Sequence, residues 1–177
     1  GPNVIMVTTS GARFGIKATI PHVLGIAIGV GITAGLTGLG IGAIVTNFPT
    51  VTLVLKIVAA TWILWMAYGM ITKARSSKQA GPDAPFSFIQ AVLFQWVNPK
   101  IWAIALVASA GYSIGLSPSG EAVRLATAFA GINLCVCLFW TFAGSLLTLL
   151  LKSDKAWSIF LGIMGVALAA SALMIFI

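Results

Sequence analysis

The amino-acid sequence predicts an all-α integral membrane protein with six transmembrane helices, the first one partial, arranged as two inverted three-helix repeats. Hydrophobic residues make up 59% of the 177 residues and charged residues only 7%, whereas about a quarter of a soluble domain is charged. Charge-free stretches of the length that crosses a bilayer, roughly 20 residues, recur along the chain. One polar linker divides these stretches into two sets of three.

The predicted spans are bounded by clusters of turn-forming residues and charges. Each is expected to be a helix, because an open strand cannot satisfy its backbone hydrogen bonds in lipid. The spans cover residues 1–10, 18–45, 51–71, 86–112, 122–151 and 156–177. Residues 1–72 then form the first repeat, 73–85 a cytoplasmic linker and 86–177 the second repeat. Because each repeat has an odd number of spans, the two enter the membrane from opposite sides, as in many secondary transporters.

The first predicted span is too short to cross a bilayer. Only ten residues precede Gly11, whereas a span needs roughly 20. We therefore expect the chain to begin in the middle of its first transmembrane helix, with the N-terminal half of that helix missing.

Lysine and arginine gather in the connections on one side of the predicted bundle. Cytoplasmic loops carry the excess of these residues, so the richer side is predicted to face the cytoplasm. This placement accounts for the net charge of +7 without a nucleic-acid partner. The richer side carries Arg13, Lys17, Lys73, Arg75, Lys78, Lys152 and Lys155, and the opposite side Lys56 and Arg124.

Two prolines, each beside an asparagine, interrupt apolar runs in corresponding places of the two halves. Pro2 precedes Asn3, and Asn98 precedes Pro99. Proline removes a helical hydrogen bond, and in a membrane the freed backbone groups are tolerated only where protein or a water-filled cavity satisfies them. Both asparagines lie about 15–18 Å from the predicted cytoplasmic end, near the bilayer midplane. Such paired breaks indicate a transporter's substrate site; alternatively, each proline only kinks its helix and each asparagine caps it.

Lys100 is a cation predicted to lie deep inside a span. A charge at that depth is costly and by default functional. We expect it to pair with a substrate carboxylate or to bind carbonyls freed by the break; alternatively, its long stem lets the ammonium snorkel to the outer interface. The candidate substrate-binding residues are therefore Gly1, Pro2, Asn3, Asn98, Pro99 and Lys100.

The other notable residues are predicted to be structural. His22 is expected to be a hydrogen-bonded packing residue, with a proton relay as the alternative. Gln95 and Asn133 are expected to bond across helices or to line the path. Cys135 and Cys137 point to different faces of one helix, which suits neither a disulfide nor a metal site. Three small-residue pairs predict close helix approach: Gly25/Gly29, Gly31/Gly35 and Gly38/Gly42.

No catalytic constellation is visible, so the protein is predicted not to be an enzyme. The sequence has one His, no metal-ligand cluster and no phosphate-binding loop, and we expect no cofactor and no metal site. The three acids, Asp83, Glu121 and Asp154, lie outside the predicted spans. Two alternatives stay open: an exporter of a metal or other small ion, which would need several such ligands within spans, and a non-transporting membrane scaffold.

Three motifs in this order resemble the LysE/RhtB family of amino-acid exporters. The first is Gly1-Pro2-Asn3, ahead of an apolar half-helix and a glycine-rich second span. The second is the third span, residues 55–71. Like that span of the family, it contains a lysine, a pair of small residues, an aromatic residue with a leucine, and a glycine, although Trp62 stands where the family usually has Tyr. The third is Asn98-Pro99-Lys100. The similarity covers essentially the whole chain, apart from the missing half-helix.

The resemblance implies a transporter of the bacterial inner membrane that exports amino acids or small amino-acid derivatives from the cytoplasm by proton antiport. Alternating access would come from rocking of the two inverted halves around the midplane site. The implied partners are the amino-acid substrate, protons and the lipid bilayer. The sequence leaves open which amino acid is carried, which ion is coupled and whether the protein forms a homo-oligomer.

Overall fold

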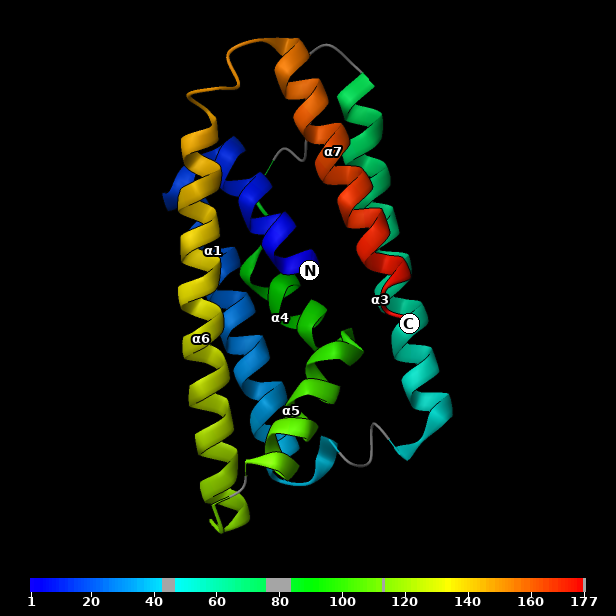
Figure 1. Ribbon diagram of the computed structural model, residues 1–177, viewed down its shortest axis with the longest axis vertical. Coiled ribbons are helices and arrows are strands. Elements are labelled where there is room, and N and C mark those ends of the chain that lie inside the picture. Colours follow the sequence, from blue (N-terminus) through cyan, green and yellow to red (C-terminus); the bar gives the residue numbers. More distant parts are fainter. Residues whose placement is uncertain (43–46, 76–83, 113, 177) are drawn as a thin grey trace.

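A computed structural model describes residues 1–42, 47–75, 84–112 and 114–176, all of whose regular structure is helical. Four of the described helices are long and apolar enough to cross a membrane, and the bent pair Phe88–Val97 and Pro99–Gly111 has the length and composition of a broken span or a re-entrant loop. The predicted all-α membrane fold is therefore confirmed (Figure 1). The helices are α1 (Pro2–Gly38), α3 (Pro49–Arg75), α4 (Phe88–Val97), α5 (Pro99–Gly111), α6 (Pro118–Leu147) and α7 (Asp154–Leu173).

Helix α1 holds the first two predicted spans, because the chain folds back at Gly15. This residue has φ 77° and ψ 175°, a conformation that glycine adopts without steric penalty. The hydroxyls of Ser10 and Thr19 are 2.9 Å apart across the turn, whereas nine residues of straight helix would span about 13–14 Å. Figure 1 shows the two parts of α1 running in opposite directions.

The connections fall at two ends of the bundle as predicted. In Figure 1 the point where α1 folds back, the end of α3 and the α6–α7 connection lie toward one end, and the start of α6 lies at the other. Several boundaries differ from the prediction, among them the ends of α1 at Gly38 and of α6 at Leu147. Helix α6 begins at Pro118 because the Ser117 hydroxyl accepts a hydrogen bond from the Gly120 N–H at 3.2 Å, an N-cap arrangement that favours proline in the first turn. Helix α3 continues to Arg75, and the rest of the linker up to residue 83, with Lys78, lies outside the described residues.

The helices pack chiefly in three pairs: α1 with α6, α3 with α7, and α1 with α4. The first part of α1 crosses α6 at two glycines. A Cβ atom at Gly11 would meet the backbone of Thr141, and one at Gly144 would meet the backbone of Thr8. The two helices therefore approach to backbone contact, as small residues permit in membrane proteins.

The predicted packing role of the glycine pairs is confirmed for five of the six positions. Cβ atoms at Gly25 and Gly29 would meet α4, and those at the next three glycines would meet α6. For Gly42 the nearest atoms belong to Thr37 of its own segment. The five are Gly25, Gly29, Gly31, Gly35 and Gly38.

Replacing Gly144 by leucine should destabilise the protein, because the new side chain would enter the backbone of Thr8. Overpacking of this kind costs about 1–3 kcal/mol. Gly131→Leu on the same helix is the matched control, since no described atom lies within 4 Å of a Cβ there. Thermal unfolding in detergent should give a lower midpoint for Gly144→Leu only. Equal midpoints would contradict the close crossing.

Cysteines introduced at Ser119 and Lys152 should label from opposite sides of the membrane, because Ser119 lies at the start of α6 and Lys152 lies in the connection that follows the other end of this helix. The parent protein would carry alanine in place of Cys135 and Cys137. In intact cells an impermeant maleimide should reach Ser119→Cys, and should reach Lys152→Cys only after permeabilisation. Reaction of both from outside would refute the predicted orientation.

Candidate functional site

The break between α4 and α5 is built from their own side chains. Asn98 has an extended backbone, with φ −83° and ψ 101°, and the two helices meet at a bend of 66°. The Asn98 Oδ1 accepts a hydrogen bond from the Lys100 N–H at 3.2 Å. The Trp102 Nε1–H reaches back across the break to the carbonyl of Trp96 at 2.9 Å. The side chain that binds this carbonyl is therefore Trp102 and not Lys100, for which binding to freed carbonyls is one of the predicted roles.

Asn3, where the first break is predicted, bonds to Gln95, which lies three residues before the break at Asn98. The Asn3 Nδ2 donates to Gln95 Oε1 at 2.9 Å, and the Gln95 Nε2 donates back to Asn3 Oδ1 at 3.3 Å. Gln95 is fully buried, so its predicted bond across helices is confirmed. The same expectation for Asn133 is wrong, since its Nδ2 donates to the Phe129 carbonyl of its own helix at 3.0 Å.

The six sequence-predicted site residues occupy two helix N-termini. Gly1 caps α1 and Pro2 is its first residue; Asn98 caps α5 and Pro99 is its first residue. In Figure 1 both helices start in the middle part of the molecule and run toward opposite ends. Helix N-termini present N–H groups and a positive dipole end, which suits an anion.

These six residues differ in exposure. Asn98 and Pro99 are buried, Asn3 is half-buried, and Lys100 is exposed. The burial of Asn98 and Pro99 fits a break enclosed by protein. The predicted binding roles of all six stay predictions.

A cavity of about 560 Å³ lies between α1, α3 and the segment that leads into α4. Its size is typical of small-molecule sites, which range over about 300–1,000 Å³. None of the six predicted residues lines it. The cavity begins about one helical turn from the hydrogen-bonded amides of Asn3 and Gln95, because Met6 lines the cavity and Asn3 lies three residues before Met6 on α1.

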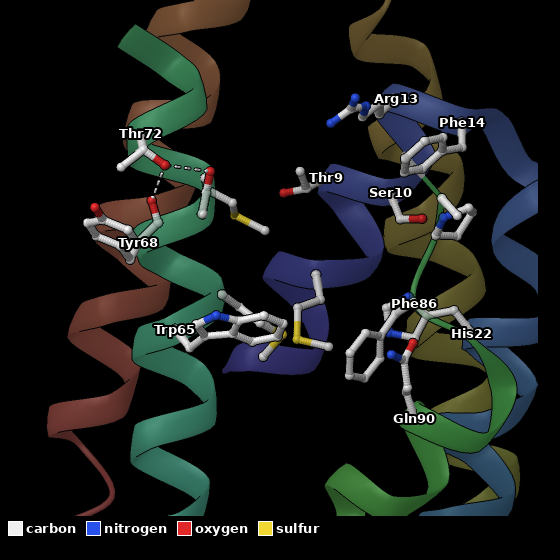
Figure 2. Close-up of a pocket in the computed structure, with 16 residues that line it drawn as sticks. Thr9, Ser10, Arg13, Phe14, His22, Trp65, Tyr68, Thr72, Phe86 and Gln90 are labelled. Atoms are coloured by element: carbon white, nitrogen blue, oxygen red, sulfur yellow. Dashed lines mark hydrogen bonds between the residues drawn. The ribbon is translucent and has the colours of Figure 1, made fainter. Parts of the chain in front are cut away.

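The walls of this cavity are mostly apolar and aromatic. Figure 2 shows Trp65 extending from α3 into the gap and Phe86 facing it from the α4 side, whereas the Tyr68 hydroxyl turns away. The Phe86 ring is held edge-on by Trp62 at a centroid distance of 5.9 Å. Trp62 also meets Phe94 at 5.7 Å, so the aromatic wall is continuous with the core near the break.

His22 lines the cavity and lacks the hydrogen bonds predicted for it. It is 1% exposed, and neither ring nitrogen has a hydrogen-bond partner among the described residues. A buried polar group left in this state costs about 1–3 kcal/mol, and such groups are rare. The ring packs edge-on against Phe86 at 5.3 Å. The prediction of a hydrogen-bonded packing residue is therefore wrong in its hydrogen bonds and right in its packing.

Arg13, Thr9 and Thr72 lie toward the end of the cavity that is predicted to face the cytoplasm (Figure 2). Arg13 lines it, with its guanidinium carbon 5.0 Å from the Phe14 ring centroid. No Asp or Glu stands among the described lining residues. Thr9 and Thr72 donate to carbonyls of their own helices at 2.8 Å, so their oxygens keep acceptor capacity. Within the described parts of the chain, no group of three His, Cys, Asp or Glu could hold a metal ion.

Comparison with known proteins relates the whole chain to one family. The family model described as LysE type translocator matches residues 1–177. A leucine efflux protein of Enterobacter sp. (strain 638) is 25% identical over 163 residues, which are 88% of this chain and 77% of that protein. A threonine efflux protein of Salmonella typhi is 26% identical over 108 residues, 56% of this chain and 52% of that protein. No solved structure matches the chain.

Replacing Trp102 by phenylalanine should weaken the α4–α5 break, because the ring is kept and the Nε1–H donor to the Trp96 carbonyl is lost. A buried acceptor left without its donor costs about 1–3 kcal/mol. Trp140→Phe, at an exposed position on α6, is the control. In detergent, the midpoint of thermal unfolding should be lower for Trp102→Phe than for Trp140→Phe. An unchanged midpoint for Trp102→Phe would show that this hydrogen bond does not stabilise the break.

Proposed function

We propose that this chain, which belongs to the LysE type translocator family, exports an amino acid or a small amino-acid derivative from the cytoplasm. The family is one of translocators and not of enzymes. Its leucine and threonine efflux relatives support an amino-acid substrate. The helices long and apolar enough to cross a membrane fit an integral membrane protein, and we propose the inner membrane of a bacterium as its location.

One observation carries the proposal: the break at which α5 begins lies beside a hydrogen-bonded pair of amide side chains. Asn3 and Gln95 bond reciprocally, and Asn98 caps α5 three residues after Gln95. A half-helix N-terminus can replace the water shell of a substrate carboxylate. Amide oxygens and carbonyls beside it can receive the ammonium. We assign substrate binding to Gly1, Pro2, Asn3, Asn98, Pro99 and Lys100.

Transport is proposed to follow from rocking of the two repeats, residues 1–72 and 86–177, around this site. Helices at equivalent positions of the repeats pack on each other: the second part of α1 on α6, and α3 on α7. The broken helices at the start of each repeat bond through Asn3 and Gln95. This pairing supports an inverted two-fold relation, the basis of alternating access in many transporters. We propose protons, moving inward, as the coupling ion.

Export should be measured with the full-length protein in liposomes loaded with a mixture of labelled amino acids. At least one amino acid should leave faster than from protein-free liposomes, and an inward proton gradient should accelerate its exit. Equal efflux with and without protein for every amino acid would refute the proposal. Faster efflux of Mn²⁺ or Zn²⁺ instead would favour the ion exporter, and no efflux of either kind would favour the scaffold.

Within the same assay, Asn98→Ser and Lys100→Gln test the assigned site. Serine keeps a good N-cap but removes the amide, and a lost hydrogen bond to a charged group costs about 1.5–3 kcal/mol. The half-saturating concentration should therefore rise roughly ten- to a hundredfold. Asn133→Ser is the control, because that amide bonds to its own helix. Normal export by both site variants would leave these residues a purely structural role.

A further inference from the structure

We propose that the cavity lined by Met6, Trp65, Phe86 and His22 holds a zwitterionic amino acid with an apolar side chain, and that His22 hydrogen-bonds its polar end. This inference rests on the proposed function and deepens it: it gives a substrate class and a second binding position, separate from the two helix breaks, from which the substrate reaches them.

The walls of the cavity suit an apolar side chain of variable size. Met6, Met66 and Met70 line it together with the rings of Trp65 and Phe86. Methionine is flexible and polarisable, so it adapts to guests of different shape. Because Trp62 supports Phe86 from behind, the aromatic side of the cavity is the more rigid one. A guest therefore has a fixed surface to pack on and a deformable one that closes over it.

His22 supplies a polar contact that the folded chain leaves unused. It is buried and lines the cavity, and both its nitrogens lack partners among the described residues. Its orientation is set by the edge-on contact with Phe86. A neutral imidazole offers one donor and one acceptor, so it can bind either the carboxylate or the ammonium of an amino acid. Figure 2 shows His22 on the same side of the cavity as Phe86 and Gln90.

The charges around the cavity select against a cationic side chain. Arg13 lines the cavity and brings a positive charge to it, which repels a second cation. The oxygens of Thr9 and Thr72 can receive the ammonium, because their hydrogens already bond within their own helices. No described lining residue is acidic. A second positive charge, as in lysine, would be desolvated without a counter-charge, which is unfavourable.

The test is exchange of labelled L-leucine by the full-length protein in liposomes, with unlabelled competitors. Leucine, methionine and phenylalanine should compete at least about tenfold better than lysine, a factor that corresponds to about 1.4 kcal/mol. His22→Leu should weaken leucine binding about ten- to a hundredfold. The same variant should unfold at an equal or higher temperature without substrate, because it removes a buried group that has no partner. Asn133→Leu is the matched control for a polar-to-leucine change.

Gln90→Glu should reduce the preference for leucine over lysine. The Gln90 Oε1 accepts the Ser87 N–H at 2.9 Å, and glutamate preserves this capping box while it adds a carboxylate to the cavity. Lysine should then gain about tenfold relative to leucine. Asp83 lies outside the described residues. Asp83→Asn should leave the preference for leucine over lysine unchanged. A change of this preference in Asp83→Asn alone would overturn the inference that the charges of the lining residues exclude lysine.

The outcomes separate this inference from the proposed function. If the protein exchanges no amino acid at all, both fail. If it exchanges amino acids but prefers lysine, or if His22→Leu binds leucine with unchanged affinity, the inference about the cavity fails and amino-acid export stands. Should His22→Leu not fold, His22→Gln replaces it, since glutamine keeps a donor and an acceptor and should retain part of the affinity.

Discussion

The structure depends on one constraint: backbone N–H and C=O groups inside a membrane must find partners within the protein. This chain interrupts its helices within apolar runs and meets the constraint from nearby side chains. At the α4–α5 break Asn98 accepts the Lys100 N–H, and Trp102 donates to the Trp96 carbonyl. At the Gly15 turn, which is predicted to lie at the cytoplasmic end, the Thr19 hydroxyl donates to the Gly15 carbonyl at 2.8 Å. Because these groups must be enclosed, the breaks draw α1, α4 and α6 together around them.

Glycine contacts then divide the molecule into tight and loose parts. The pairs α1–α6 and α3–α7 are extensive, whereas α3 meets α4 and α5 over few residues. The cavity lies at this sparsely packed interface, here called the seam, between α1, α3 and the chain leading into α4. A seam with few contacts can open at small energetic cost, while glycine crossings such as that of Gly11 on α6 resist change because backbone touches backbone. On the proposed function, the seam is the part of the molecule that would move.

The sequence predicted the helices and breaks better than it predicted the cavity. Spans follow from apolar length, the α4–α5 break from Pro99, and the close crossings from glycine spacing, all of which are local signals. The pairing of Asn3 with Gln95 could be expected only as some bond across helices. The neighbourhood of His22 could not be predicted, because Phe86 and Trp65 come from distant segments that meet only in the folded bundle. Asn133 shows the converse error: a polar group within a span bonded to its own helix.

The position of the amide pair, one turn beyond the cavity, bears on how substrate and movement are coupled. A ligand shifts a conformational equilibrium only if it binds one state better than the other. Asn3 and Gln95 satisfy each other in the present structure, and separating them without replacement would forfeit hydrogen bonds worth about 0.5–1.5 kcal/mol each. A substrate carboxylate or ammonium reaching them from the cavity offers charge-assisted bonds, which are roughly twice as strong. On the proposed function, the empty protein therefore favours the closed pair and the loaded protein favours its opening, as an exporter requires.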